Sequence, residues 1–388
     1  MKGSAFAATL LLLLLLLLPP LPAAADSDWF RIGPEAAARW SVSGEANRVE
    51  LRRRDGNGTG PRVTVFYSRP SLAYETAMTK LLAVFEDKGI DAVFTAINYQ
   101  DNADQGHAAI KQVLATPVDL IFAMGSESTA FLVRHFQGQR IPVVSVCAKD
   151  PVILGQLRNY DSGSGTNFAF TSLNVPVETQ MAYLLQLRPN LKNVGVLVDS
   201  RNLSAVQTQA EPFIAAARRH GIDATMIAVN DPADARRQLR EKIPPAIEVM
   251  RQSDPQLSDS ILLVTGSTSV FTEIDTINEV AGTVPVLSVV PEIVRKGDSS
   301  ATLSIGISFE SNAHLAAIYG ADILAGRATA ANMKVGIVSP PDIAINFRKA
   351  RQIGLKIPFS LFELASYVYD GDGNPARVNG LNSARARP

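Results

Sequence analysis

Two glycine–serine pairs carry residue types that bind an anionic group. Gly125-Ser126 follows an apolar run that ends at Met124, and Gly266-Ser267 follows one that ends at Thr265. A serine between a buried strand and a helix offers a hydroxyl together with free backbone N–H groups, which suit a carboxylate or phosphate oxygen. The alternative is that both serines only cap their helices. The pairs therefore indicate a site for an oxygen-rich group, with helix capping as the competing interpretation.

Charged residues accompany these pairs at other predicted strand ends. Arg69 could pair with an anionic ligand or with a surface carboxylate, and Lys149 could contact the ligand or form an ion pair with the next residue. A desolvated ammonium group needs an anionic or carbonyl partner, and Glu127, Asp199 and Glu292 are candidates for that role. The predicted ligand-binding residues are Ser68, Arg69, Tyr74, Gly125, Ser126, Glu127, Lys149, Asp199, Ser200, Gly266, Ser267, Glu292, Ser308 and Phe309.

Aromatic residues could form a flat wall for the same ligand. Tyr67, Tyr74, Phe170 and Phe309 are the candidates, although each alone is more often part of a core. The thin supply of acidic groups argues against a polyamine or a free metal ion, which would need several carboxylates. We therefore expect a small organic molecule with a carboxylate or a similar acceptor group.

The usual residue constellations of an enzyme are missing from the sequence. His107, His135, His220 and His314 fall in predicted helices without metal-ligand spacing, and Cys147 has no evident histidine partner. Neither a G-x-S-x-G elbow nor a G-x-x-x-x-G-K-[ST] phosphate loop occurs. We predict binding without turnover, metal or cofactor. A two-lobed glycosyltransferase or sugar-nucleotide epimerase is the main enzymatic alternative.

A sequence duplication explains how distant candidates could meet. Residues 89–92 (GIDA) return as 221–224 (GIDA), and 141–146 (IPVVSV) return as 284–289 (VPVLSV). Two further segments match in the same order, which predicts two similar lobes with a ligand cleft between them.

Strands and helices are predicted to alternate from residue 62 onward, which is typical of open parallel sheets covered on both faces. Pro244-Pro245 should interrupt or end the helix that contains them. The predicted strands are 63–67, 92–97, 120–124, 143–146, 194–198, 224–229, 261–265 and 286–289. The predicted helices are 72–88, 103–114, 126–136, 175–187, 204–219, 233–250, 269–281 and 311–324.

The fold class that follows is α/β, with two Rossmann-like lobes that are each built on a parallel sheet. Lobe one should comprise 61–170 plus a returning segment at 301–328, and lobe two 171–300 plus 329–370. An N-terminal extension and linker is expected over 26–60, because 52–60 reads as a charged turn and a glycine-rich connection. Residues 371–388 are expected to be a flexible tail.

The first 25 residues are typical of an export signal. Lys2 precedes a leucine run at 10–18, and Ala23-Ala24-Ala25 supplies a cleavage site. A retained membrane anchor is the alternative, but the apolar run is short and is followed by Pro19-Pro20. We expect cleavage and a periplasmic protein.

The composition argues against one class of partner and against disulfide bonds. The 37 basic and 37 acidic residues balance, which argues against a nucleic-acid groove. With a single cysteine the chain has no internal disulfide, so its stability must come from its core.

Motifs spread over 62–364 carry a family resemblance. They include 67–70 (YSRP), 149–151 (KDP) and, most specifically, 344–358 (AINFRKARQIGLKIP), which is similar to the signature INLKTAKKLGLTIP. The chain resembles the exported substrate-binding proteins of ABC transporters, in the group with a type I periplasmic-binding fold that includes tryptophan- and tyrosine-binding members.

The resemblance implies two lobes whose parallel sheets are joined by three crossings at a hinge. The lobes would close on a small-molecule ligand and deliver it to an ABC permease in the inner membrane. The ligand would be amino-acid-like or a carboxylate or aromatic compound, and we expect a monomer. A sensor lobe that presents its ligand to a membrane receptor is the alternative.

The sequence departs from the family at three segments. The acidic or amide residues that amino-acid-binding members often carry are missing from 265–268 (TGST), 289–291 (VVP) and 306–309 (GISF). An amino-acid ligand is thereby weakened but not excluded.

Overall fold

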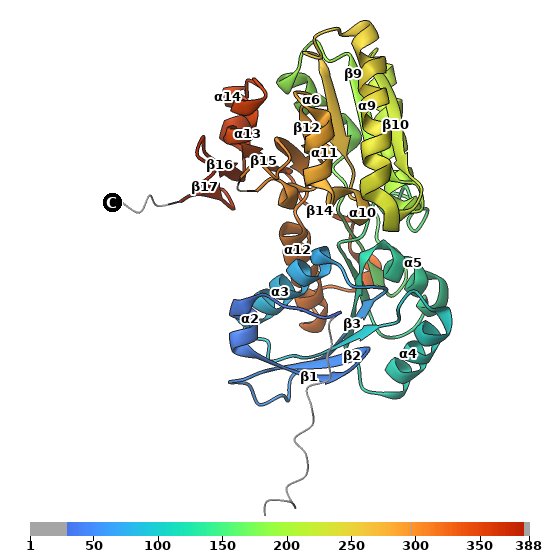
Figure 1. Cartoon of the computed structure of the whole chain (residues 1–388). Helices are drawn as coiled ribbons and strands as arrows, with labels where there is room; N and C mark the ends of the chain where they lie inside the picture. The colour runs from blue at the N-terminus through green and yellow to red at the C-terminus, as the bar shows by residue number, and fades with distance from the viewer. Residues whose placement is uncertain (1–28, 296, 384–388) are drawn as a thin grey trace, which may run out of the picture.

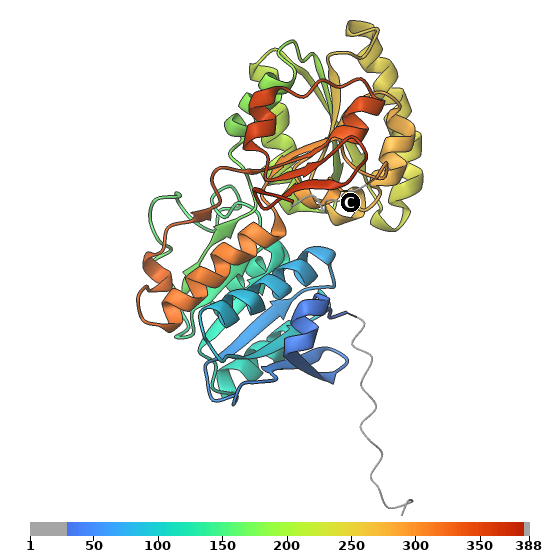
Figure 2. The ribbon, with the colours of Figure 1, turned by 90° about the vertical axis from the view of Figure 1, so that its left-hand side faces the viewer.

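The computed structural model describes residues 29–295 and 297–383. The chain forms two lobes that are joined along one side, as Figures 1 and 2 show from two directions. The predicted signal peptide at 1–25 lies outside the described residues. Within the described part of the chain, no helix is both long and apolar enough to cross a membrane.

Lobe one is built on a seven-stranded sheet with the order β1-β2-β4-β3-β5-β6-β7. The strands from β4 to β7 are parallel, while β1 and β2 pair antiparallel at one edge. The bounds are β1 (Trp40–Glu45), β2 (Arg48–Arg53), β3 (Arg62–Tyr67), β4 (Val93–Asn98), β5 (Leu120–Met124), β6 (Val143–Val146) and β7 (Phe168–Ala169).

Helices cover both faces of this sheet because its strands are apolar on both sides. Val63 and Val65 of β3 pack in the core shared with helix α3, while Phe66 packs with helices α4 and α5 on the opposite face. Helix α12 lies beside α3, although the two are far apart in sequence (Figure 2). The bounds are α2 (Pro34–Arg39), α3 (Leu72–Asp87), α4 (Ala103–Ala115), α5 (Gly125–Phe136) and α12 (Phe309–Leu324).

Lobe two carries a nine-stranded sheet with the order β10-β9-β11-β12-β13-β15-β16-β17-β18, parallel from β10 to β13. Its strands are β9 (Asn193–Asp199), β10 (Asp223–Val229), β11 (Ser260–Val264), β12 (Val286–Ser288), β13 (Leu303–Gly306), β15 (Asp342–Asn346), β16 (Tyr367–Tyr369), β17 (Pro375–Val378) and β18 (Leu381–Asn382). Its helical elements are α6 (Val177–Leu187), α7 (Leu203–Ala205), the π-helical turn η2 (Val206–Ala210), α8 (Glu211–Arg219), η3 (Pro232–Asp234), α9 (Ala235–Ser253), α10 (Thr268–Phe271), α11 (Ile274–Ala281), η4 (Pro291–Ile293), α13 (Phe347–Gln352) and α14 (Phe359–Leu364).

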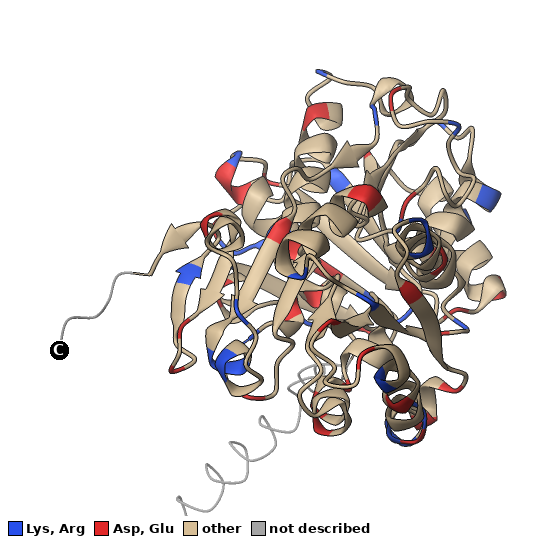
Figure 3. Cartoon of the chain, turned by 90° about the horizontal axis from the view of Figure 1, so that it is seen from above, with Lys and Arg blue, Asp and Glu red and all other residues tan. Residues whose placement is uncertain are grey.

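The surface of lobe two mixes both signs of charge. Figure 3 shows basic and acidic residues interspersed over its helices. Arg236 pairs with Glu273, and Arg240 pairs with Glu279, so these side chains tie α9 to the region of α11. Exposed pairs of this kind contribute little stability each.

The structure differs from the sequence-based expectation at the ends of the chain. Residues 40–53 are strands β1 and β2 of the first sheet rather than part of an extension and linker, because Trp40, Val49 and Leu51 are buried in its core. Strands β17 and β18 extend the second sheet into the segment expected to be a flexible tail at 371–388.

The structure also differs from two expectations about the interior of the chain. Strand β13 pairs with β12 and β15 of the second sheet, so 303–306 does not join lobe one as expected for 301–328. Helix α9 continues through Pro244-Pro245, which were expected to interrupt or end it. The apolar stripe formed by Leu239, Ile243 and Ile247 is buried on both sides of the prolines, and this packing offsets the lost helical hydrogen bonds.

A small hinge region joins the lobes. Strand β8 (Thr171–Ser172) pairs with β14 (Gly336–Ile337) in a separate two-stranded sheet. Asn312 of α12 is fully buried there: its Oδ1 accepts from the Cys147 N–H at 2.7 Å, and its Nδ2 donates to the Ser172 carbonyl at 3.1 Å. One side chain therefore connects α12, β8 and the segment after β6.

Candidate functional site

A cavity lies between the lobes, beyond the carboxyl ends of the parallel strands. Its volume is about 40 Å³, which leaves room for water but not for an organic ligand. A ligand could enter only if the lobes moved apart. The cavity is lined by Arg69, Ser71, Ala73, Tyr74, Ser126, Glu127, Cys147, Lys149, Leu173, Asn202, Ser204, Gly266, Thr268, Phe271 and Phe309.

Lys149 is the most informative residue of this cavity. The side chain follows β6, is 7% exposed, and its Nζ donates to the carbonyl oxygen of Gly266 in lobe two at 3.3 Å. No carboxylate among the described residues lies within ion-pair distance of this amine, although its neighbour Asp150 was a candidate. Burial lowers the pKa of Lys149, because the charged form loses its hydration. Among the described residues, the hydrogen-bond partner of this buried amine is thus a neutral oxygen.

A second cation, Arg69, stands at the edge of the cavity. Its Nη2 lies 3.2 Å from Oε1 of Glu127, and both side chains are partly exposed. The pairing brings together two predicted ligand residues, but it uses Arg69 for an internal contact in this conformation. Glu127 could return to solvent if an anionic ligand took its place, because both groups remain accessible.

Gly125 makes room for Tyr74 rather than facing the cavity. The glycine has a φ of +81°, and a Cβ placed on it would lie 1.9 Å from the Tyr74 hydroxyl oxygen. The strand-to-helix turn from β5 to α5 therefore needs glycine both for its backbone and for the approach of the tyrosine. Tyr74 is 7% exposed, and burial raises its pKa, so the phenol stays protonated.

The two serines of the glycine–serine pairs have different surroundings. Ser126 lines the cavity, and its Oγ accepts from the Lys149 backbone N–H at 2.9 Å. Ser267 is fully buried outside the cavity lining, and its Oγ accepts from the Asp199 N–H at 3.3 Å. Neither side chain caps its helix. Both hold neighbouring strand-end loops together, and only Ser126 also faces the cleft.

The other predicted residues of lobe two surround the cavity without entering its lining. The Asp199 carboxylate accepts from Ser269 Oγ at 2.8 Å and from the Arg201 N–H at 2.9 Å. Ser200 turns toward the Val229 carbonyl at 3.2 Å. In this conformation both side chains are hydrogen-bonded to other residues of lobe two.

Glu292 and Ser308 line a different pocket of about 240 Å³ together with Tyr367 and Tyr369. Glu292 accepts from the Phe309 N–H, and Ser308 caps α12 by accepting from the Ser311 N–H at 3.0 Å. Burial raises the pKa of Glu292 to about 8. Ser68, the last predicted site residue, is fully buried and outside the cavity.

The proposed aromatic wall is divided. Tyr74 and Phe309 line the cavity, whereas Tyr67 faces a neighbouring pocket and Phe170 stacks on Phe168 in the core of lobe one. Phe271 completes the apolar side of the cavity, 6.3 Å from the Phe309 ring.

Sequence reasoning missed several lining residues. Cys147, Asn202 and Thr268 belong to strand-end segments that the sequence did indicate, whereas Leu173 and Phe271 come from the hinge and from α10. Cys147 is buried, and its Sγ lies 3.7 Å from the Phe309 carbonyl oxygen while the residue also lines the cavity. The sequence held no signal for Leu173 and Phe271 beyond their apolar character.

Gln209 is another residue that sequence reasoning did not single out. It lies in η2, and its Oε1 accepts from the Gly266 N–H at 2.8 Å, beside the carbonyl that Lys149 contacts. A π-helical turn widens the helix by one residue, and such turns are frequent at functional sites.

Solved structures share this fold. A conserved domain protein from Vibrio cholerae matches with a TM-score of 0.63 and 21% identity, covering 80% of this chain and 100% of that one. An ABC domain from Streptococcus pneumoniae in complex with L-Trp matches with a TM-score of 0.64 and 18% identity, over the same shares. The ligand-free, open structure of CD0873, a substrate binding protein with adhesive properties from Clostridium difficile, matches with a TM-score of 0.58 and 20% identity, covering 77% and 96%. The predicted fold class is confirmed.

Sequence comparison gives the family. No curated protein matches the chain at a significant level. The family model described as "ABC transporter substrate binding protein" matches residues 62–369, which is most of the chain. The resemblance read from the motifs is thereby confirmed, and the chain belongs to the family of ABC transporter substrate binding proteins.

Proposed function

We propose that this protein is a periplasmic solute-binding subunit that holds a small organic carboxylate between its lobes and delivers it to an ABC permease. The observation that carries the proposal is the Lys149 amine, which is buried in the interlobe cavity and, in the described part of the chain, has the Gly266 carbonyl as its hydrogen-bond partner. A buried ammonium gains most from an anionic partner, because its lost hydration is otherwise poorly compensated.

The rest of the cavity suits the same ligand class. Arg69 could contribute a second cationic group once Glu127 turns away. Phe271, Phe309 and Leu173 offer an apolar surface for the body of the molecule. The ligand would be an aromatic or aliphatic carboxylate, or an amino acid whose amine is met by Glu127.

Opening and closing of the lobes is part of the proposal. A cavity of about 40 Å³ cannot hold such a ligand, so the lobes must separate to admit it. In the open state the Lys149–Gly266 contact would break, and the ligand carboxylate would then occupy the position of the carbonyl. Delivery to a permease would follow from recognition of the ligand-closed form.

The first test identifies the ligand. The full chain, purified without denaturation, would be examined by native mass spectrometry, and we expect a co-purified molecule that carries a carboxylate. Calorimetry would then compare this acid with its primary amide, which keeps the shape but loses the charge. We expect at least tenfold weaker binding of the amide. Equal affinity of acid and amide would contradict the carboxylate assignment.

A second test addresses delivery. Vesicles that contain the cognate permease and ATPase should accumulate the labelled ligand only when the binding protein is added on the outer side. Conversion of the ligand to a product by the binding protein alone would instead support an enzyme.

A further inference from the structure

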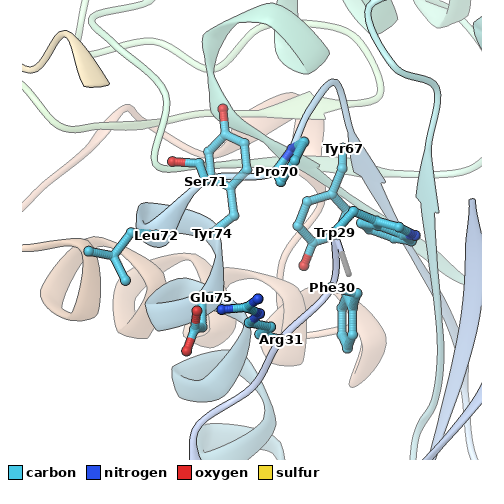
Figure 4. Close-up of a pocket in the computed structure, with 9 residues that line it drawn as sticks. All are labelled: Trp29, Phe30, Arg31, Tyr67, Pro70, Ser71, Leu72, Tyr74 and Glu75. Atoms are coloured by element: carbon cyan, nitrogen blue, oxygen red, sulfur yellow. The ribbon is translucent and has the colours of Figure 1, made fainter. Parts of the chain in front are cut away.

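A second pocket lies on lobe one, next to the interlobe cavity. Its volume is about 300 Å³, the lower end of the range for small-molecule sites. It shares Ser71 and Tyr74 with the interlobe cavity but is built without lobe two. Figure 4 shows the side chains that line it: Trp29, Phe30, Arg31, Tyr67, Pro70, Ser71, Leu72, Tyr74 and Glu75.

One wall of this pocket comes from a segment outside the family match. Residues 29–31 precede the matched region, which begins at residue 62, so this wall belongs to the chain's own N-terminal part. The segment packs against Tyr67 at the end of β3 and faces the start of α3.

The pocket is walled by aromatic rings in edge-to-face contact. The ring centroids of Trp29 and Tyr67 are 5.4 Å apart, those of Phe30 and Tyr67 are 6.1 Å apart, and those of Tyr67 and Tyr74 are 5.8 Å apart. Such rings present edges and faces that a further flat ring can join.

The same pocket contains a buried hydrogen-bond donor without a partner in the described part of the chain. The Tyr67 hydroxyl is buried, with the whole residue 3% exposed, and it has no hydrogen-bond partner among the described residues. Figure 4 shows this hydroxyl directed toward Arg31 and Phe30. Burial raises the pKa of Tyr67, so the group remains a donor. A buried hydroxyl without a hydrogen-bond partner costs desolvation free energy, which favours binding of a ligand that supplies an acceptor.

Arg31 is the cationic residue of this pocket, and the acidic residue Glu75 also lines it. The Arg31 side chain is exposed and forms neither a hydrogen bond nor an ion pair with another described residue. An anionic group that accepts from the Tyr67 hydroxyl could also pair with this guanidinium, because both residues line the pocket.

We propose that this pocket is a second binding site, separate from the interlobe cleft, for a planar aromatic carboxylate. The ring would lie among Tyr67, Tyr74 and Phe30, and the carboxylate would accept from the Tyr67 hydroxyl and pair with Arg31. This goes beyond the proposed function, because binding here requires no closure of the lobes.

The test uses benzoate as the probe and the Lys149→Met variant of the full chain as the host, so that the interlobe site is weakened. Calorimetry should detect one site with a dissociation constant on the order of 1 mM or below. Benzoate should also quench Trp29 fluorescence, while the fully buried Trp40 provides a constant background. Cyclohexanecarboxylate should bind more weakly, because it lacks the flat ring.

Two pocket variants locate the binding. Tyr67→Phe should weaken benzoate binding about fivefold, and Arg31→Gln about tenfold or more. The matched controls Tyr183→Phe and Arg140→Gln alter side chains outside the pocket and should leave the affinity unchanged.

Two results would overturn the proposal. One is the absence of benzoate binding in the Lys149→Met host. The other is benzoate binding that neither Tyr67→Phe nor Arg31→Gln weakens. Either result leaves the interlobe function intact, because that function is tested with the co-purified ligand and with Lys149 present.

Discussion

The side-chain amine of Lys149, in lobe one, lies 3.3 Å from the backbone carbonyl oxygen of Gly266, in lobe two. The two residues follow β6 and β11, which belong to different sheets, so this contact spans the cleft. Gln209 holds the N–H of the same glycine at 2.8 Å, which fixes the direction of its peptide. The contact therefore both holds the lobes together and occupies the cation that a ligand would use.

Lys149→Met should separate these two roles. We expect affinity for the co-purified carboxylate to fall at least tenfold, because a hydrogen bond to a charged group contributes about 1.5–3 kcal/mol. The free energy of unfolding should stay level or rise, because a buried ammonium without an anionic partner is removed. Calorimetry and urea unfolding measure the two quantities.

Lys111→Met is the control, because Lys111 is exposed on α4. It should leave both quantities unchanged. Unaltered ligand affinity in Lys149→Met would contradict the assigned role of the amine.

Gly125→Ala should destabilise the protein by about 3 kcal/mol. The left-handed backbone costs about 1–2 kcal/mol for alanine, and the added Cβ would overlap the Tyr74 hydroxyl. Urea unfolding measures the loss. In the double variant with Tyr74→Phe, part of the loss should be recovered, although the ring carbon Cζ at 2.7 Å would still crowd the methyl group.

Gly138→Ala isolates the backbone contribution. Gly138 has a φ of +85° and no atom within 4 Å of its would-be Cβ, so only the conformational cost remains. Equal losses in Gly125→Ala and Gly138→Ala would show that the approach of Tyr74 costs nothing.

The parallel cores of both lobes could be predicted because buried parallel strands are apolar along their length. Residues 120–124 and 143–146 were assigned at the bounds that β5 and β6 have in the structure. Strands β1 and β2 were missed because the arginines at 52–54 and the following glycines are typical of a linker. The alternation of buried Val49 and Leu51 with polar residues was the available signal for a half-buried strand.

The candidate site could be predicted only to the level of strand-end segments. The position of a residue after a strand indicates which edge of the sheet it occupies, but not where its side chain points. Ser126 faces the cavity while Ser267 binds the Asp199 N–H, although their sequence contexts are alike. The direction depends on neighbouring loops, which the sequence alone does not place.

Asn312→Leu should destabilise the hinge by about 3 kcal/mol or more. The leucine would leave the Cys147 N–H and the Ser172 carbonyl without their partners in a fully buried position. Besides urea unfolding, hydrogen exchange should show faster exchange of the Cys147 amide. Asn332→Leu, at an exposed position, is the control and should change neither quantity. Protection of the Cys147 amide that survives in Asn312→Leu would rule out this role.

Glu292 should make stability fall as the pH rises. Burial raises the pKa of its carboxyl from an ordinary 4.5 to about 8, and nearby Asp342 and Glu310 add to the rise. Between these two values the folded protein holds a proton that the unfolded chain has released, so protonation favours folding. This contribution to stability is complete below about pH 4.5 and is lost as the pH rises through 8.

Glu292→Gln resembles the protonated form, so its free energy of unfolding should depend less on pH. Between pH 5 and pH 8 the change in this free energy should differ from that of the wild type by at least about 1 kcal/mol. Urea unfolding at four pH values measures both profiles, with Glu363→Gln as the control because Glu363 is exposed. Parallel profiles for wild type and Glu292→Gln would mean that the carboxyl is already ionised in the folded protein at neutral pH.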